Sequence, residues 1–391
     1  MILGASYSQL PLYEAARKLG AATVAASTPG DWPGFAVADE SVYADITNPE
    51  AILKAAQEKG IDGIATCCLD AGVRALGYTC EKMGLIGPSA RAADISNDKF
   101  KMKEAFMAGG VQCARHICIH SLEELEEALE KLEFPVVLKA VDLMGSRGIF
   151  RCNTREETFF YYNKTMEATR KDYCLVEEFI EGQVLGCEAM IRDGKLLYCL
   201  PNNIEAFQSY VPTPIGHSVP YRKQEELGAE VRHQVELAIK AVGLDNCPVN
   251  CDLIEKDGKI YVIEITGRAG GTCLPEMVSI YYGINYYEAI VRLALGMDVE
   301  EMFRGKTSGV ANLSRTLLSE KDGVVKAIHN ENEPAEDIVD LSFNIAPGEE
   351  VHHYTNGRDR LGQVILQGES LESCERNLAD VLSKINIEFT V

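Results

Sequence analysis

The chain lacks the signals of several large classes of protein. Its 391 residues contain no run of eighteen apolar residues, and Met1 leads into a strand-like segment without a charged leader. We therefore expect a cytoplasmic protein without a membrane span. Basic residues are also few, since 38 Lys and Arg stand against 59 Asp and Glu for a formal net charge of −21. Such an acidic chain is a poor candidate for nucleic-acid binding, so any polyphosphate site must use local groups of Lys and Arg.

Common cofactor and metal motifs are missing as well. The thirteen cysteines include no Cys-x-x-Cys pair, and most lie in apolar runs, which indicates buried, reduced thiols. No GxxxxGK[ST] sequence occurs, and the first turn, which begins at Gly4, lacks GxGxxG. The sequence therefore excludes a P-loop and gives no dinucleotide fingerprint.

The length and the pattern of apolar runs indicate two or three domains with a large core. In residues 1–95, short apolar strands alternate with helical stretches, which predicts a Rossmann-like, parallel, doubly wound sheet. Residues 96–304 contain most of the candidate functional groups. Residues 305–391 contain short strands and a final helix over 371–385, which predicts a small α+β domain. Residues 201–222 are rich in proline, and we interpret them as a long binding loop or lid, with disorder as the alternative.

Two carboxylates, Asp252 and Glu264, lie in apolar runs that flank the turn sequence Lys256–Lys259. A buried carboxylate must be paired, protonated or bound to a metal. A two-residue turn at Asp257-Gly258 would place the acids on opposite faces of the hairpin. A three-residue loop, which we favour, pairs Asn250 with Glu264 and gives one face the side chains of Asn250, Asp252, Glu264, Thr266 and Arg268. These groups suit Mg²⁺ holding a polyphosphate, whereas the alternative is an edge hairpin with solvated acids.

Further candidates precede this hairpin. Lys99 lies in the first turn of a helix that opens near Ser96, where its charge opposes the helix dipole. Lys139 ends the apolar strand after Phe134, and the loop Gly145-Ser146-Arg147-Gly148 follows it. Loops of this type can cover phosphates with backbone N–H groups. Each of these signals is weak by itself.

Taken together, these residues resemble the ATP-grasp superfamily of ligases, with four motifs in the family's order. The motifs are Asp98-Lys99, Lys139 with the Gly145–Gly148 loop, the hinge Val176-Glu177-Glu178-Phe179-Ile180, and Asp252 with Glu264 and Arg268. The resemblance implies a Rossmann-like pre-ATP-grasp domain over residues 1–95. It also implies a two-subdomain ATP-grasp fold over 96–304, with a lid subdomain at about 112–178, and a C-terminal α+β domain over 305–391. The stretches Gly267–Glu276 and Gly216–Pro220 look like the branch of L-amino-acid and other carboxylate–amine ligases.

The resemblance also implies roles for individual residues and for ATP with Mg²⁺ or Mn²⁺. Nucleotide binding falls to Lys99, Lys139, Ser146, Arg147, Gly148, Glu177, Glu178, Phe179 and Ile180. The metal would be held by Asp252 and Glu264, with Thr266 in a place where the family often has Asn. Arg268 and Lys139 would stabilise the transferring phosphoryl group, and His217 is a candidate substrate contact or base. Val184 stands where many relatives carry a ribose-binding glutamate.

The expected reaction joins a small-molecule carboxylate, such as an amino acid, to an amine through an acyl phosphate, and releases ADP and phosphate. One alternative is an enzyme of the same fold that activates bicarbonate or formate. Another is a non-catalytic nucleotide-binding protein. A homodimer is the commonest assembly among soluble oligomers in general, and we expect no partner among nucleic acids or membranes.

Overall fold

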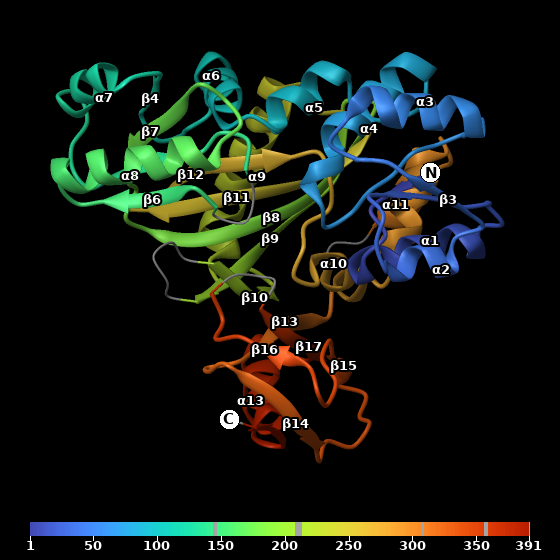
Figure 1. Cartoon of the computed structure of the whole chain (residues 1–391). Helices are drawn as coiled ribbons and strands as arrows, with labels where there is room; N and C mark the ends of the chain where they lie inside the picture. Colours follow the sequence, from blue (N-terminus) through green and yellow to red (C-terminus); the bar gives the residue numbers. More distant parts are fainter. Residues whose placement is uncertain (144–146, 208–212, 306–308, 356–358, 391) are drawn as a thin grey trace. The chain divides into compact units, whose positions relative to one another are not determined.

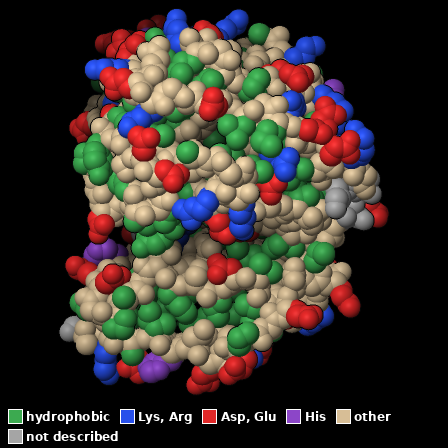
Figure 2. Space-filling model, turned by 90° about the vertical axis from the view of Figure 1, so that its right-hand side faces the viewer, with side chains coloured by type: hydrophobic (Ala, Val, Ile, Leu, Met, Phe, Trp, Pro, Cys, Tyr) green, Lys and Arg blue, Asp and Glu red, His purple; other side chains and the backbone are tan. Residues whose placement is uncertain are grey.

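The computed structural model describes residues 1–143, 147–207, 213–305, 309–355 and 359–390. Internal contacts divide the chain into two compact units. The first unit comprises residues 1–201, 223–271 and 285–304, and the second comprises 202–222, 272–284 and 305–391. No helix among the described residues is long and apolar enough to cross a membrane. On the face drawn in Figure 2, acidic and basic side chains are interspersed, without a continuous basic area among the described residues.

The N-terminal part of the first unit contains a small parallel sheet in the order β1-β2-β3. Ala65 adds a parallel bridge to Ile2, and helices surround the strands (Figure 1). The expected alternation of strands and helices is confirmed, although Glu40–Tyr43 forms a strand that the apolar pattern did not indicate. The elements are β1 Ile2–Leu3, α1 Leu10–Lys18, β2 Val24–Ser27, α2 Pro33–Val37, β3 Glu40–Tyr43, α3 Pro49–Lys59, α4 Val73–Met83 and α5 Ala90–Ser96.

A four-stranded antiparallel sheet follows, in the order β4-β7-β5-β6. Two helices pack on it, and they bury a core that includes Leu125, Leu138 and Val176. The elements are β4 His116–Ile119, α7 Leu122–Leu129, β5 Val136–Lys139, β6 Ile149–Cys152, α8 Arg155–Ala168 and β7 Cys174–Glu178.

The rest of the first unit is built on the strands β12-β11-β8-β9, of which β9 continues into the second unit. The amphipathic helix α9 packs on β12. The elements are α6 Lys99–Gly109, β8 Gln183–Arg192, β9 Lys195–Phe207, α9 Gln224–Val242, β11 Cys247–Lys256, β12 Lys259–Thr266, α11 Tyr286–Ala294 and α12 Glu300–Phe303.

The second unit contains the strand order β9-β10-β13-β17-β15 and a separate sheet β16-β14-β18. Its strands and final helix confirm the expected α+β character of the C-terminal residues. The interpretation of residues 201–222 as a loop or lid is wrong for the described part, which forms the end of β9 and all of β10. The elements are β10 Thr213–Val219, α10 Leu274–Tyr282, β13 Ala311–Leu318, β14 Gly323–Asn330, β15 Ile338–Phe343, β16 Glu350–Val351, β17 Arg360–Gly368, α13 Leu371–Ser383 and β18 Ile385–Thr390.

Candidate functional site

Asp252 on β11 and Glu264 on β12 lie directly opposite each other in the antiparallel ladder. The favoured three-residue loop is wrong, because Lys256 pairs with Lys259 across a two-residue turn. Asp257 and Gly258 both have positive φ, which matches the turn type preferred in tight hairpins. A bulge between Asp252 and Leu253 then shifts the register. The shift returns both acids to one face, with Asn250 opposite Thr266. The shared face is therefore confirmed, but a tight turn with a bulge produces it in place of the three-residue loop.

The acid pair has the chemistry of a site for a hard cation. Asp252 is exposed and Glu264 is half-buried, and β12 is the edge strand of its sheet. The surrounding protein and the charge of Glu264 nevertheless raise the pKa of Asp252 to about 6, so a cation between the two carboxylates would be favourable. Two carboxylates fit Mg²⁺, which usually takes its remaining oxygens from water and phosphates. No group of three or more His, Cys, Asp or Glu is arranged for metal binding among the residues that the structure describes. Thr266 donates its hydroxyl hydrogen to Asp70 at 3.1 Å, and its role as a metal ligand stays a prediction.

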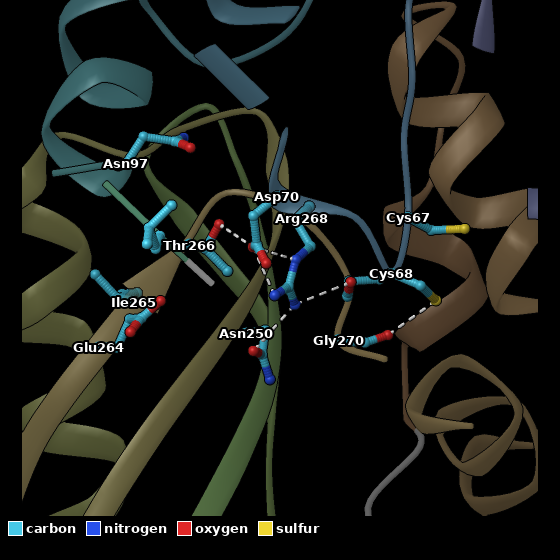
Figure 3. Close-up of polar contacts among 12 residues, drawn as sticks. Cys67, Cys68, Asp70, Asn97, Asn250, Glu264, Ile265, Thr266, Arg268 and Gly270 are labelled. Atoms are coloured by element: carbon cyan, nitrogen blue, oxygen red, sulfur yellow. Dashed lines mark hydrogen bonds and ion pairs between the residues drawn. The ribbon is translucent and has the colours of Figure 1, made fainter. Parts of the chain in front are cut away.

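Arg268 is held by residues from two distant parts of the first unit (Figure 3). Its Nε donates to Asp70 Oδ1 at 2.6 Å, and one terminal nitrogen donates to Asn250 Oδ1 at 3.0 Å. Asp70 follows the Thr66–Leu69 segment, whose backbone pairs with Ala269. Although burial opposes it, Arg268 holds the pKa of Asp70 below its usual range. Sequence reasoning missed Asp70, and only its place after an expected strand end could have drawn attention to it.

Glu188 on β8 is a second carboxylate that sequence reasoning missed. It is fully buried, and it accepts hydrogen bonds from Asn250 Nδ2 at 2.8 Å and from the Gly270 amide at 3.2 Å. Burial raises its pKa to about 8. Its contacts tie β8 to Asn250, which itself holds Arg268. The signal was present, because an acid inside the apolar run from Val184 to Ile191 is the same pattern that singled out Asp252 and Glu264.

The two predicted lysines lie in ion pairs. Lys99, the first residue of α6 after the N-cap Asp98, has its ammonium 3.4 Å from Glu264 and donates to the Leu143 carbonyl at 2.7 Å. Lys139, at the end of β5, forms an ion pair with Glu177 of β7. Lys99 is therefore joined to the acid pair by a direct contact. Glu177 also contacts Lys103, which sequence reasoning missed.

The hinge residues around Glu178 are held by backbone contacts. The Glu178 amide donates to the Arg115 carbonyl at 2.9 Å, and the Phe179 amide donates to the Pro135 carbonyl at 3.1 Å. These two N–H groups are therefore used within the protein. A backbone contact to adenine would have to come from other groups of the hinge, such as those of Ile180.

The glycine loop is described only in part, since Ser146 lies outside the described residues. Gly148 has a φ of +66°, and a Cβ there would lie 2.8 Å from the Cβ of Ala140. Its carbonyl accepts a hydrogen bond from the Ala140 amide at 2.8 Å, while Arg147 is exposed. Glycine is therefore required at 148, and the covering of phosphates stays a prediction.

His217 belongs to the second unit, on β10, where it is buried. Its Nδ1 lies 2.9 Å from Asn202 Oδ1, which fits a proton on Nδ1 and leaves Nε2 as an acceptor. Burial lowers the pKa of His217 to about 4, so the ring is neutral near pH 7. The structure thus gives His217 the protonation state of a base, and its role stays a prediction.

The chain is similar to known proteins over its whole length. Residues 96–272 match the family described as the ATP-grasp domain, and residues 315–390 match the L-amino acid ligase C-terminal domain 2. The structure of phosphoribosylglycinamide synthetase from Anaerococcus prevotii is 40% identical, with a TM-score of 0.86, and the match covers 100% of this chain and 98% of that one. The chain belongs to the ATP-grasp family, which makes it an ATP-grasp ligase.

The C-terminal match adds a feature shared with L-amino acid ligases. The structure of L-amino acid ligase from Bacillus licheniformis is similar over 100% of this chain and 98% of that one, with a TM-score of 0.85 at 19% identity. Alanine–anticapsin ligase from Bacillus subtilis strain 168 is 25% identical over 276 residues, which span 64% of this chain and 58% of that protein. The first of these two similarities shows the fold alone.

Proposed function

We propose that this protein is an ATP-dependent carboxylate–amine ligase whose acid substrate is an amino acid or a similar small carboxylate. A carboxylate oxygen attacks the γ-phosphorus of ATP, so that the bond from phosphorus to the bridging oxygen breaks and ADP leaves. The amine then attacks the acyl carbon, loses a proton, and expels phosphate as the amide forms. The proposal keeps the division into segments 1–95, 96–304 and 305–391.

The residues of the first unit supply the charges that phosphoryl transfer needs. Asp252 and Glu264 would hold Mg²⁺, which neutralises phosphate charge when it is bound. Lys99 and Lys139 would bind phosphate oxygens, and Arg268 would contact the transferring group through its planar guanidinium. Ser146, Arg147 and Gly148 would exclude water from the acyl phosphate. His217, a residue of the second unit, keeps its candidate role as a substrate contact or base.

One observation carries the proposal. Asp252 and Glu264 face each other on neighbouring strands, Lys99 contacts Glu264 at 3.4 Å, and Arg268 is fixed by Asn250 two residues before Asp252. A protein that only bound nucleotide would not need two acids, a lysine and an arginine gathered in this way. The same groups would also serve an enzyme that activates bicarbonate or formate, and the match of residues 315–390 to the L-amino acid ligase C-terminal domain 2 favours the amino acid.

A second candidate specifies both substrates. The full-length similarity at 40% identity to a phosphoribosylglycinamide synthetase favours glycine as the acid and a phosphoribosylated amine as its partner. This candidate keeps the same residues in the same roles, and it differs only in what lies beyond the reacting groups.

The test is Mg²⁺-dependent release of ADP and phosphate, with amide product identified by mass spectrometry. Wild type is compared with Arg268→Met on pairs of amino acids, on glycine with phosphoribosylamine, and on bicarbonate or formate. We expect release that requires both an acid and an amine and that is lost in the variant. Release with bicarbonate alone, or no release despite measurable ATP binding, would contradict the proposal.

A further inference from the structure

Glu177 is a buried carboxylate that would lose an ion-pair partner when ATP binds. Glu177 is 2% exposed, and its Oε1 pairs with Lys139, the lysine expected to bind a phosphate of ATP. Lys139 and Glu177 lie on one face of the β5–β7 pair, because Lys139 is opposite Leu175 and Glu177 is opposite Val137. If Lys139 turns to a phosphate, Glu177 loses its nearest cation. A buried carboxylate left without a partner is strongly destabilising, so the exchange needs a second cation.

Lys103 lies where such a cation is needed. It follows Lys99 by one helical turn on α6, so the two side chains project from the same side of the helix. The side chain of Lys103 is 2% exposed, and its ammonium is 3.3 Å from Glu177 Oε2, on the opposite oxygen from Lys139. A lysine is almost never this buried unless it is paired. Glu177 is its only ion-pair partner among the described residues.

Lys103 and Glu177 can still form a stronger contact with each other. Neither Lys103 Nζ nor Glu177 Oε2 makes a hydrogen bond of good geometry within the described part of the chain. A small movement that shortens their contact would therefore gain a charge-assisted hydrogen bond. Although burial opposes it, Lys103 and Lys139 lower the pKa of Glu177 to about 2, so the carboxylate stays charged. Burial lowers the pKa of Lys139, although the charge of Glu177 opposes this shift. The charge of Lys103 lowers the pKa of Lys139 further.

We propose that Lys103 is a positioning residue that keeps Glu177 paired while Lys139 transfers its ammonium to an ATP phosphate. The inference rests on the proposed function for the ATP site and adds a residue to it. Without nucleotide, Glu177 is shared by two lysines. With nucleotide, Lys103 and Glu177 form a neutral pair, and the charge of Lys139 is available to the phosphate. The same pairing keeps Glu177 ionised.

The experiment measures binding of the non-hydrolysable analogue AMPPNP with Mg²⁺ by titration calorimetry, which requires no turnover. The variants are Lys103→Met, Lys103→Arg, Glu177→Gln and the double variant Lys103→Met/Glu177→Gln. Lys101→Met is the matched control, because Lys101 is a lysine of the same helix that pairs with Asp94 at the surface. Thermal melting of each variant verifies that it is folded.

We expect Lys103→Met to weaken binding by about 10- to 100-fold, as the loss of one partner of a buried pair predicts. Lys103→Arg and Lys101→Met should bind within a few-fold of wild type. In the Glu177→Gln background the same Lys103→Met change should have little effect, because no carboxylate is left to be stranded. If Lys103→Met does not fold, Lys103→Gln, which keeps a hydrogen-bond donor, takes its place in both backgrounds.

Two results would overturn the inference while leaving the ATP site intact. One is wild-type affinity in Lys103→Met. The other is an equal loss of affinity in both Glu177 backgrounds, which would mean that Lys103 acts on the nucleotide directly or only fills space. A wild-type protein that does not bind AMPPNP at all would overturn the proposed function, and the role of Lys103 with it.

Discussion

The lysines and the arginine of this site are paired in two different ways. Lys99 and Lys139 contact Glu264 and Glu177, which are themselves expected to serve the metal and the nucleotide. Arg268 instead contacts Asp70 and Asn250, which have no expected ligand of their own. ATP and Mg²⁺ must therefore exchange the partners of the lysines, whereas the contacts of Arg268 can persist through the reaction. The difference separates residues that adjust on binding from one that is fixed in advance for phosphoryl transfer.

The largest effect should follow from removing one charge of the acid pair. Glu264→Gln takes away both a metal carboxylate and the partner of Lys99, so we expect kcat/KM to fall on the order of 10³-fold. Asp252→Asn should behave similarly. Steady-state ADP release at several Mg²⁺ concentrations measures this. Full rescue by high Mg²⁺ would show that the acids only strengthen metal binding.

Asp70→Asn tests whether Arg268 is fixed in advance. The variant keeps the shape of the side chain but removes its charge, so we expect kcat to fall about 10- to 100-fold while the KM for ATP stays within a few-fold. Asp45→Asn is the control, because Asp45 bonds only to its own turn at Thr47 among the contacts described. A rise in KM for ATP without loss of kcat would place Arg268 among the residues that adjust on binding.

Lys99→Met tests the lysines that must exchange partners when ATP binds, and it should have a smaller effect. Because Lys99 must leave Glu264 and Leu143 before it can bind a phosphate, part of its binding energy is spent on the exchange. We expect the dissociation constant for AMPPNP to rise about tenfold, with a smaller change in kcat. Calorimetry measures the dissociation constant, and steady-state kinetics measure kcat. A loss of kcat as large as that of Asp70→Asn would remove the distinction between the two groups.

The residues that the sequence identified share one property: their chemistry is unusual for their local pattern. Asp252 and Glu264 are acids in apolar strands, and Lys99 opposes a helix dipole, so a window of a few residues was enough. The residues that fix them were missed for the opposite reason. Asp70 meets Arg268 across 198 residues of sequence, and nothing near it predicts that contact. Lys103 resembles any solvated lysine of a helix until Glu177 is placed beside it.

The wrong expectations also have local causes. Proline at 214 argued against a strand, yet β10 accommodates it at a shift of register between Pro214 and Gly216, where a ladder hydrogen bond is not needed. The hairpin turn was misjudged because a bulge changes the face of every residue beyond it, and no short motif predicts this one.

The smallest effect on catalysis should come from Glu188→Gln, and its main consequence should be a change in stability with pH. Burial raises the pKa of Glu188 from its ordinary value of 4.5 to about 8. The folded protein then holds a proton that the unfolded chain releases between these values. This contribution to stability is present below about pH 4.5 and is lost as the pH rises towards 8, at up to about 1.4 kcal/mol per pH unit.

Glutamine resembles the protonated acid and does not titrate, so the variant should lack this slope. Urea unfolding of both proteins between about pH 5 and pH 8 measures the difference, and Asp252, which titrates in both, largely cancels. Parallel stability curves would mean that Glu188 is ionised in the folded protein, held by Gly270, Asn250 and Arg268. Glu188 would then be a fixed anion beside Arg268, as Asp70 is, and not a neutral hydrogen-bonding group.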